Sequence, residues 1–288
     1  MNEAIRLMLQ RYKCTTASDY ESALKEIIQE IALLGLWRAK FFEHAAFYGG
    51  SALRILYGLN RFSEDLDFSL VKEKESFSLS RYHTAVKAEL LAFGFEARVT
   101  SISKTQLTPI ESAFIKADTL SHLINVGVPD SVHKLVQKNK VMAIKFEIDT
   151  KPSLGFEIEN RSLLQPIPFN INTYSAPDLF AGKMHCVLCR AWKTRVKGRD
   201  WYDMVWFVAQ GIPLRLKFLQ SKLILSKVLS QGEELSVEAL KKIYQRRVEA
   251  LDVERAQDDV RPFLQDPDST KIWSHEFFTD LFFKIRWV

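Results

Sequence analysis

Apolar residues recur at helical spacing early in the chain, after a polar run that suits the start of a helix. Residues 15–19 supply capping side chains, and the next apolar positions are Leu24, Ile27, Ile28, Ile31 and Leu34. Spacings of three and four residues predict an amphipathic helix that packs on a core. The next patterns predict a helix end and approach to a glycine turn over 41–48, a short helix over 52–58, a strand over 66–70 and a helix over 79–93.

Alternating or continuous apolar runs dominate the middle of the chain, roughly between Asp65 and Glu159. They predict strands over residues 95–101, 110–117, 120–126 and 141–149. From Ala176 onward the pattern turns helical, with helices expected over 178–191, 199–208, 214–229, 237–247 and 277–285. Pro166, Pro168 and Pro177 mark the change. We therefore expect an α+β protein, with a mixed sheet and flanking helices in residues 1–175 and a helical domain in residues 176–288 that completes the active site.

Composition indicates a folded protein of a reducing compartment. The 288 residues are 47% apolar, which is ample for a buried core, and no apolar run is long enough to span a membrane. Residues 1–6 lack the order of a secretory signal, so we expect a cytoplasmic protein with no membrane partner. Cys186 and Cys189 form a C-x-x-C, but a zinc site needs more ligands than His185 can add.

The net charge of +5 suits a polyanionic partner such as RNA or a nucleotide, and equally suits an ordinary surface. Basic residues also alternate between Trp192 and Trp201, at Lys193, Arg195, Lys197 and Arg199. Cations next to aromatic rings are typical of phosphate contact and base stacking, so this loop is a candidate RNA contact.

The segment Gly49-Gly50-Ser51 enters a predicted helix. Consecutive glycines allow backbone N–H groups to face an anion, and the start of a helix adds a favourable dipole. Ser51 adds a hydroxyl. Many such turns bind nothing, so the meaning of this one depends on the residues beyond the short helix.

Two carboxylates, Asp65 and Asp67, come after the glycine turn on a predicted strand. They are two residues apart, so both lie on one face. Like charges this close repel unless a cation lies between them, and Mg²⁺, which takes oxygen ligands and phosphate oxygens, is the expected ion. On the later strand Lys145, Glu147 and Asp149 share a face, and either Glu147 or Asp149 completes a metal cage if the two strands pair. The alternative is an exposed edge strand with paired charges.

These residues resemble the DNA polymerase β-like nucleotidyltransferases, whose signature is a Gly-Ser turn, a short helix and an Asp-x-Asp strand. The fuller pattern, 49–54 with Arg61-x-Ser63-x-Asp65-Leu66-Asp67-Phe68, is similar to the AbiEii branch, the toxins of type IV toxin–antitoxin and abortive-infection systems. The resemblance implies the polymerase β-like fold, a site that uses Mg²⁺ or Mn²⁺, an NTP substrate, nucleotide contacts by the turn and by Arg61 and Ser63, and a cognate antitoxin protein.

A second match to the AbiEii branch lies in the helical half, at Asp178 to His185 and at Lys197 to Asp203. It implies that Lys183 contacts the triphosphate, that Asp200 is a catalytic or site-organising acid, and that Arg199 belongs to the nucleotide site. Independently of the family, a lysine in an apolar helix needs an anionic partner or a route to solvent. Arg199, Asp200 and Asp203 are also typical of salt bridges at the start of a helix.

The resulting hypothesis is a Mg²⁺-dependent nucleotidyltransferase. Asp65, Asp67 and either Glu147 or Asp149 hold metal ions, while Gly50, Ser51 and Lys183 contact the triphosphate, and the acceptor is the 3′ end of an RNA such as tRNA. The alternatives are transfer to a protein side chain or to an antibiotic-like small molecule, and a nucleotide-binding regulator without catalysis.

Overall fold

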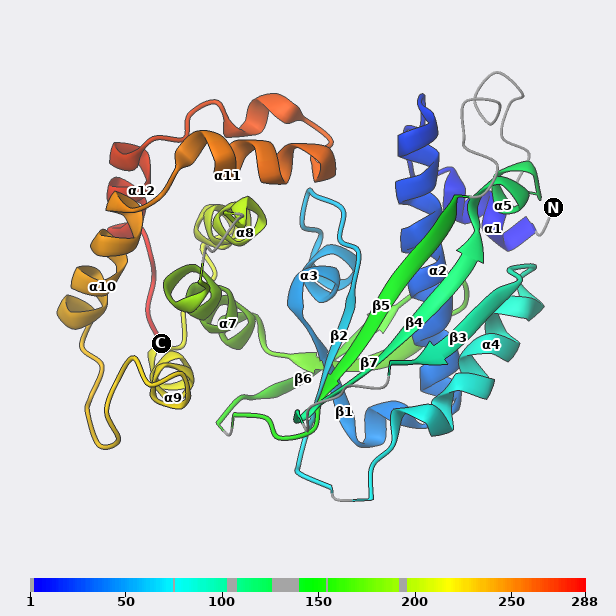
Figure 1. Cartoon of the computed structure of the whole chain (residues 1–288), viewed down its shortest axis with the longest axis horizontal. Helices are drawn as coiled ribbons and strands as arrows, with labels where there is room; N and C mark the ends of the chain where they lie inside the picture. Colours follow the sequence, from blue (N-terminus) through cyan, green and yellow to red (C-terminus); the bar gives the residue numbers. More distant parts are fainter. Residues whose placement is uncertain (1–2, 75, 103–107, 126–139, 154, 192–195) are drawn as a thin grey trace. The chain divides into compact units, whose positions relative to one another are not determined.

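The computed structural model describes residues 3–74, 76–102, 108–125, 140–153, 155–191 and 196–288 (Figure 1). Contacts divide the chain into two compact units. Unit 1 consists of Met1–Tyr57, Phe62–Pro152 and Asn160–Thr173. Unit 2 consists of Gly58–Arg61, Ser153–Glu159 and Tyr174–Val288. Two short segments that precede residue 160 therefore belong with the helical second half.

A mixed seven-stranded sheet forms the centre of unit 1, in the order β3-β4-β5-β2-β1-β7-β6. The strands are β1 Ala45–Tyr48, β2 Leu66–Leu70, β3 Ala97–Ser101, β4 Ile110–Asp118, β5 Val141–Asp149, β6 Ile158–Leu163 and β7 Phe169–Tyr174. Strand β2 pairs antiparallel with β1 and parallel with β5, while β4 runs antiparallel to both β3 and β5. Strand β2 thus lies between β1, its neighbour in sequence, and the distant β5.

Five α-helices are described in unit 1: α1 Glu3–Leu9, α2 Ala17–Arg38, α3 Gly49–Tyr57, α4 His83–Ala92 and α5 Thr119–Asn125. Short 3-10 turns, η1 Phe41–Glu43 and η2 Leu79–Tyr82, lead into β1 and α4. Helix α2 starts at a capping box, in which Thr16 and Asp19 each accept from the backbone N–H of the other, as the sequence predicts. Its apolar face packs on the sheet, where Phe41, Phe68 and Phe146 form part of a buried aromatic cluster.

Unit 2 is helical. Its elements are α7 Ala176–Cys189, α8 Gly198–Ala209, α9 Leu216–Leu225, α10 Val237–Glu249, α11 Val253–Val260, η3 Arg261–Phe263, η4 Pro267–Thr270 and α12 His275–Phe282. Trp201, Tyr244 and Phe278 meet in its core, and the Tyr244 hydroxyl donates to the Phe278 carbonyl at 2.9 Å. These contacts dock α12, which overlaps the helix predicted over 277–285, on the core of unit 2.

The predicted elements differ from the structure at particular places. The strand prediction over 120–126 is wrong for the residues described, because 119–125 form α5, which Asp118 caps by accepting from the Ser121 N–H at 2.7 Å. Strand β1 replaces the predicted helix end, and the short helix begins at Gly49 instead of residue 52. Strands β6 and β7 and helices α1 and α11 were not predicted; each has only six to eight residues.

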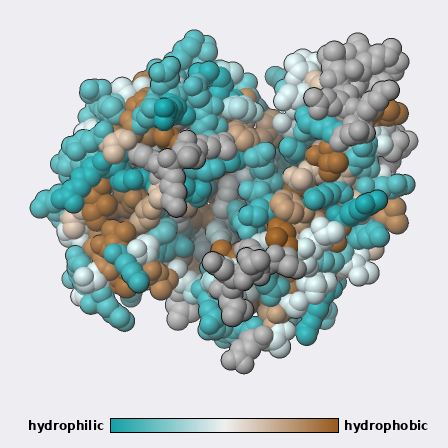
Figure 2. All heavy atoms as spheres, viewed as in Figure 1, coloured by the Kyte–Doolittle hydropathy of each residue, from teal (hydrophilic) through white to brown (hydrophobic). Residues whose placement is uncertain are grey.

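The surface and the cysteines add two observations. On the face seen in Figure 2, hydrophilic residues cover much of the surface and apolar residues occur in groups between them. In the described part of the chain no helix is long and apolar enough to cross a membrane. Cys14, Cys186 and Cys189 are free thiols.

Candidate active site

The glycine turn connects β1 directly to α3. Gly49 has φ +83°, a backbone conformation that other residues rarely adopt. A Cβ atom at this position would lie 2.7 Å from Asp67 Oδ2, because Tyr48 and Asp67 are register partners on β1 and β2. Only glycine therefore allows the turn to approach the Asp67 carboxylate this closely.

Ser51 ties the first turn of α3 to the start of β2. Its side chain is buried, and its hydroxyl donates to the Asp65 backbone carbonyl. The hydroxyl proton therefore serves to position Asp65. Gly50, also buried, lies at the N-terminus of α3, where the first N–H groups of a helix have no partner within it. This end of α3 suits an anion.

Helix α3 is anchored to α2 by a partly buried ion pair. Arg54 Nε lies 2.8 Å from Glu26 Oε2, and Glu26 also accepts from the Tyr12 hydroxyl at 2.9 Å. The neighbouring Glu30 pairs with Arg11 at 2.7 Å. This network was not predicted from the sequence, although two glutamates inside the apolar run of α2 are a usable signal, since buried charges need partners.

The parallel pairing of β2 with β5 decides which later carboxylate lies beside Asp67. Asp67 is the register partner of Glu147, whereas Asp149 is opposite Ser69. Asp65 directly precedes the first residue of β2, two residues before Asp67. The register therefore favours Glu147 over Asp149 as the third carboxylate. We call Asp67, Glu147 and Ser112, which is the partner of Glu147 on β4, the carboxylate row.

Glu147 is held in place by its neighbours. Ser112 Oγ donates to Glu147 Oε1 at 2.7 Å, and Lys145 Nζ lies 2.9 Å from Glu147 Oε2. Asp149 Oδ1 instead accepts from the Lys151 N–H at 2.9 Å, at the end of β5. Ser112 was not predicted as a site residue, because only the β4–β5 register brings it to Glu147.

The donor chemistry of Asp65, Asp67 and Glu147 fits a hard cation such as Mg²⁺, which prefers carboxylate oxygens. Asp67 and Glu147 lie on directly paired positions, both partly exposed. Within the described residues, no three or more His, Cys, Asp or Glu side chains are grouped closely enough to hold a metal ion. The structure thus brings two of the three predicted ligands together, and the third, Asp65, directly precedes β2.

A second set of predicted residues forms a buried ion cluster inside unit 2. Arg61 donates two hydrogen bonds to Asp203, from Nε to Oδ1 and from Nη2 to Oδ2, both at 2.6 Å. Lys183 Nζ on α7 lies 2.7 Å from the same Asp203. The Asp203 side chain is 0% exposed and that of Arg61 is 2% exposed. We call Arg61, Lys183, Asp200 and Asp203 the buried ion cluster.

Asp200 completes the cluster at the start of α8. Its Oδ1 lies 3.5 Å from Lys183 Nζ and its Oδ2 lies 3.2 Å from Arg190 Nε. Burial opposes the charge on Lys183, but Asp203 and Asp200 outweigh it and raise the pKa of Lys183. Burial likewise disfavours the Asp203 carboxylate, yet Arg61 and Lys183 hold the pKa of Asp203 below its usual value. Lys183 therefore finds its anionic partners within unit 2.

Tight packing fixes the first turn of α8. A Cβ atom at Gly198 would lie 1.7 Å from the Ala256 carbonyl oxygen of α11, so only glycine fits. The next residue, Arg199, lies over the Phe263 ring at 4.2 Å from the centroid. Among the other predicted site residues, Ser63 accepts a hydrogen bond from Gln29 Nε2 at its carbonyl, at 3.1 Å. Lys197 precedes α8, while Lys193 and Arg195 lie outside the described residues.

Fold and site together define a nucleotidyltransferase: a glycine turn opens a helix against paired carboxylates on a mixed sheet. The family model described as "Nucleotidyl transferase AbiEii toxin, Type IV TA system" matches residues 31–279. The chain belongs to this family, as its sequence motifs predict.

Solved structures that match this chain show low sequence identity. JHP933 from Helicobacter pylori is 16% identical, with a TM-score of 0.47 over 91% of this chain and 88% of that one. An antigenic nucleotidyltransferase-like protein from Paracoccidioides brasiliensis is 14% identical, with a TM-score of 0.43 over 75% of this chain and 92% of that one. Comparison with curated protein sequences gave no significant match.

Proposed function

We propose that the protein is a Mg²⁺-dependent enzyme that transfers NMP from an NTP to the 3′ hydroxyl of an RNA such as tRNA, as the toxin of a type IV toxin–antitoxin system. The observation that carries this proposal is the strand register, which pairs Glu147 with Asp67. Asp67 in turn lies directly against the turn at Gly49. Family membership supports the donor chemistry and an antitoxin partner. The net charge of +5 is compatible with an RNA acceptor.

Each group of unit 1 has a defined task in this reaction. The N-terminus of α3 at Gly50 binds phosphate oxygens of the NTP. Asp65, Asp67 and Glu147 would hold Mg²⁺, which supplies charge stabilisation at the reacting phosphate. The acceptor oxygen bonds to the α-phosphorus as the bond from that phosphorus to the bridging oxygen breaks. Pyrophosphate leaves, and the hydroxyl proton passes to a carboxylate of the row.

The predicted nucleotide contacts of unit 2 remain a separate part of the proposal. Lys183, Asp200 and Arg199 were expected at the triphosphate, and Lys193, Arg195 and Lys197 at the RNA. Lys183 and Asp200 already neutralise one another within the buried ion cluster. Their first expected effect is therefore on the folding of unit 2, and any nucleotide contact adds to that role.

Incubation of the full chain with total tRNA, each α-labelled NTP and Mg²⁺ tests the proposal. We expect label on tRNA with wild-type protein and its loss with Asp67→Asn and with Glu147→Gln. Asp149→Asn is the matched control, because Asp149 lies on the same strand face but opposite Ser69, and we expect it to retain transfer.

The other outcomes contradict the proposal in distinct ways. Label on the protein or on a small-molecule acceptor, with none on tRNA, would assign a different acceptor to the same donor site. NTP binding without label in any acceptor pool would indicate a regulator. Equal activity of Asp67→Asn and wild type would overturn the assignment of the carboxylate row.

A further inference from the structure

One face of strands β3, β4 and β5 is exposed over much of its area. Figure 1 shows α2 and α4 along the other side of these strands, and the side chains that point that way, such as Ile115 and Ile144, are each 1% exposed. Arg98, Lys116 and Ala143, which point the opposite way, are exposed. We call this side the open face of the sheet. It is the face that carries Asp67 and Glu147.

The strand register arranges the open face in rows that start at the carboxylates. The carboxylate row contains Ser112, Glu147 and Asp67. The next row lies two residues further along each strand. In it Phe114 of β4 is paired with Lys145 of β5 on one side and with Thr100 of β3 on the other. Two residues further, the third row pairs Ala143 with Lys116 and Lys116 with Arg98.

We call Phe114, Lys116 and Arg98 the basic track. Adjacent rows are roughly 7 Å apart along the strands and adjacent strands about 5 Å apart, so the track begins one row from Glu147. Lys145 lies between them, in contact with Glu147. The sequence of groups away from the reaction centre is therefore carboxylate, aromatic ring, then two cations.

Phe114 is the aromatic member of the track and is only partly buried. Lys116 Nζ lies 5.4 Å from the centroid of its ring. An exposed ring on a sheet is a stacking platform for any base, and cations beside it suit the adjoining phosphates. A ring for base stacking, Phe114, and a cation for phosphate contact, Lys116, thus lie two residues apart on β4.

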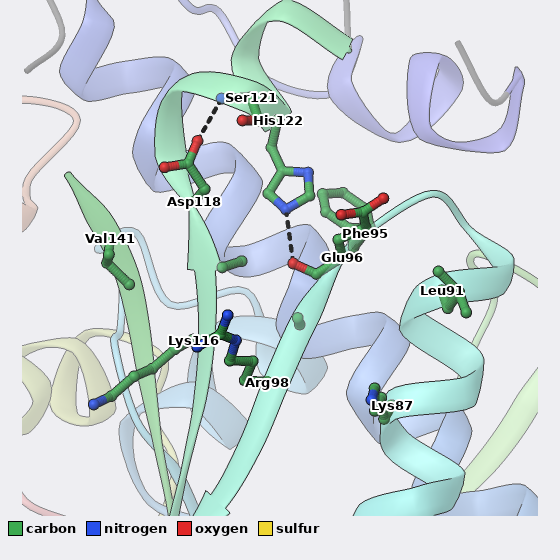
Figure 3. Close-up of a pocket in the computed structure, with 12 residues that line it drawn as sticks. Lys87, Leu91, Phe95, Glu96, Arg98, Lys116, Asp118, Ser121, His122 and Val141 are labelled. Atoms are coloured by element: carbon green, nitrogen blue, oxygen red, sulfur yellow. Dashed lines mark hydrogen bonds between the residues drawn. The ribbon is translucent and has the colours of Figure 1, made fainter. Parts of the chain in front are cut away.

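The third row opens into a pocket of about 720 Å³ at the edge of the sheet, shown in Figure 3. Arg98 and Lys116 line it from the strands and Lys87 lines it from α4, while His122 borders it from α5. The acidic Asp118 also lines the pocket, but its Oδ1 accepts from the Ser121 N–H as the cap of α5. His122 Nε2 faces the Glu96 carbonyl at 3.3 Å. The pocket thus adds space beside the track, and its lining includes three cations, Lys87, Arg98 and Lys116, and two acids, Glu96 and Asp118.

We propose that the basic track binds the single-stranded 3′ end of the RNA acceptor. The terminal nucleotide reaches the carboxylate row, a preceding base stacks on Phe114, and the upstream phosphates contact Lys116 and Arg98. This inference rests on the proposed function, whose acceptor it assigns to a surface of unit 1. Charge complementarity and continuity with the carboxylate row select a nucleic acid strand as the occupant.

Equilibrium binding of a fluorescent single-stranded oligoribonucleotide and of total tRNA to the full chain tests the track without requiring transfer. Arg98→Glu/Lys116→Glu is the test variant. Its matched control is Lys72→Glu/Lys151→Glu, which makes the same change in net charge at exposed lysines beyond the opposite ends of β2 and β5. Phe114→Leu keeps an apolar side chain but removes the ring.

We expect the test variant to bind RNA roughly ten-fold more weakly than wild type, or weaker still. The plot of log affinity against log salt should become less steep by about 1.4, since each of two lost single-strand phosphate contacts contributes about 0.7. Phe114→Leu should weaken binding roughly ten-fold through loss of stacking. The RNA affinity of the control variant should match that of wild type. The NTP affinity of every variant, measured by thermal shift, should also match that of wild type.

Three results would overturn the inference. One is equal loss of RNA affinity in the control and test variants, which would mean nonspecific charge. Another is unchanged RNA affinity in the test variant. The third is an absence of RNA binding by the wild type. A wild type that transfers NMP to a protein while binding no RNA would overturn the track and leave the donor chemistry intact, so the two proposals fail separately.

Discussion

The carboxylate row and the buried ion cluster both contain residues of the sequence motifs, yet their charges are arranged differently. In the row, like charges occupy paired positions of neighbouring strands and remain partly exposed. In the cluster, Arg61 and Lys183 are matched to Asp203 and Asp200 and are shielded from water. Like charges placed side by side destabilise a sheet, whereas alternating buried charges satisfy one another. We therefore propose that the row binds a ligand, whereas the ion pairs of the cluster join segments of unit 2.

Substitution of one aspartate in each region gives the largest expected effects, and they differ in kind. Asp67→Asn should reduce transfer roughly a thousand-fold, because charge stabilisation by a bound metal is worth several kcal/mol, with little change in thermal unfolding. Asp203→Ala should lower the unfolding free energy of unit 2 by roughly 3–5 kcal/mol, because it leaves Arg61 and Lys183 buried without their shared partner. Activity assays paired with denaturant unfolding measure both. The comparison breaks down if Asp203→Ala folds with wild-type stability.

A glycine pair tests the packing that holds the cluster. Gly198→Ala should destabilise unit 2 by about 3 kcal/mol, since its Cβ would meet the Ala256 carbonyl oxygen at 1.7 Å. Gly182→Ala on α7 is the matched control, because a Cβ there meets nothing within 4 Å. The control should be neutral or up to about 1 kcal/mol more stable. Equal unfolding midpoints for the two variants would contradict the close approach of α8 and α11.

The two units should also respond to pH with opposite signs. The pKa of Asp203 lies below its usual 3.8 because Arg61 and Lys183 outweigh the effect of burial. Its contribution to stability is present above that usual value and is lost as the pH falls through the lower, folded-state pKa. In unit 1, burial raises the pKa of Glu30 to about 7 from 4.5, against the effect of Arg11. Its contribution is complete below pH 4.5 and is lost as the pH rises through about 7.

Unfolding curves across this pH range check both limbs. Glu30→Gln should flatten the decline near neutral pH while leaving the acid limb in place, and Asp203→Asn should do the reverse. An acid limb that survives in Asp203→Asn would assign that limb to other carboxylates.

The smallest expected effect concerns the positioning of the row. Ser51→Ala removes the hydroxyl that donates to the Asp65 carbonyl and should cost about 1–3 kcal/mol of stability, because it leaves a buried acceptor unpaired. If Ser51 mainly positions Asp65, kcat should fall several-fold while the KM for NTP stays constant. A large rise in KM with constant kcat would instead indicate direct phosphate contact by Ser51.

The sequence predicted the type of reaction more accurately than it predicted which side chains are in contact. Two-residue alternation was enough to place Glu147 and Asp149 on one face of β5, because strand geometry is local, whereas Asp65 lies one residue before β2. The choice of Glu147 required the β2–β5 register, which depends on residues far apart in the chain. Lys183 was correctly expected to need an anionic partner, but the partners are Asp203 and Asp200 of its own unit. Residues 120–126 misled the prediction because short apolar runs suit a helix as well as a strand.

Binding of Mn²⁺, followed by electron paramagnetic resonance in the presence of a nonhydrolysable NTP, tests the central claim that the carboxylate row holds the divalent ion. Wild type and Asp149→Asn should both reduce the signal of free Mn²⁺ to the same extent, and Asp67→Asn should leave most of it. Mn²⁺ binding by folded Asp67→Asn that is as tight as in wild type would contradict the account.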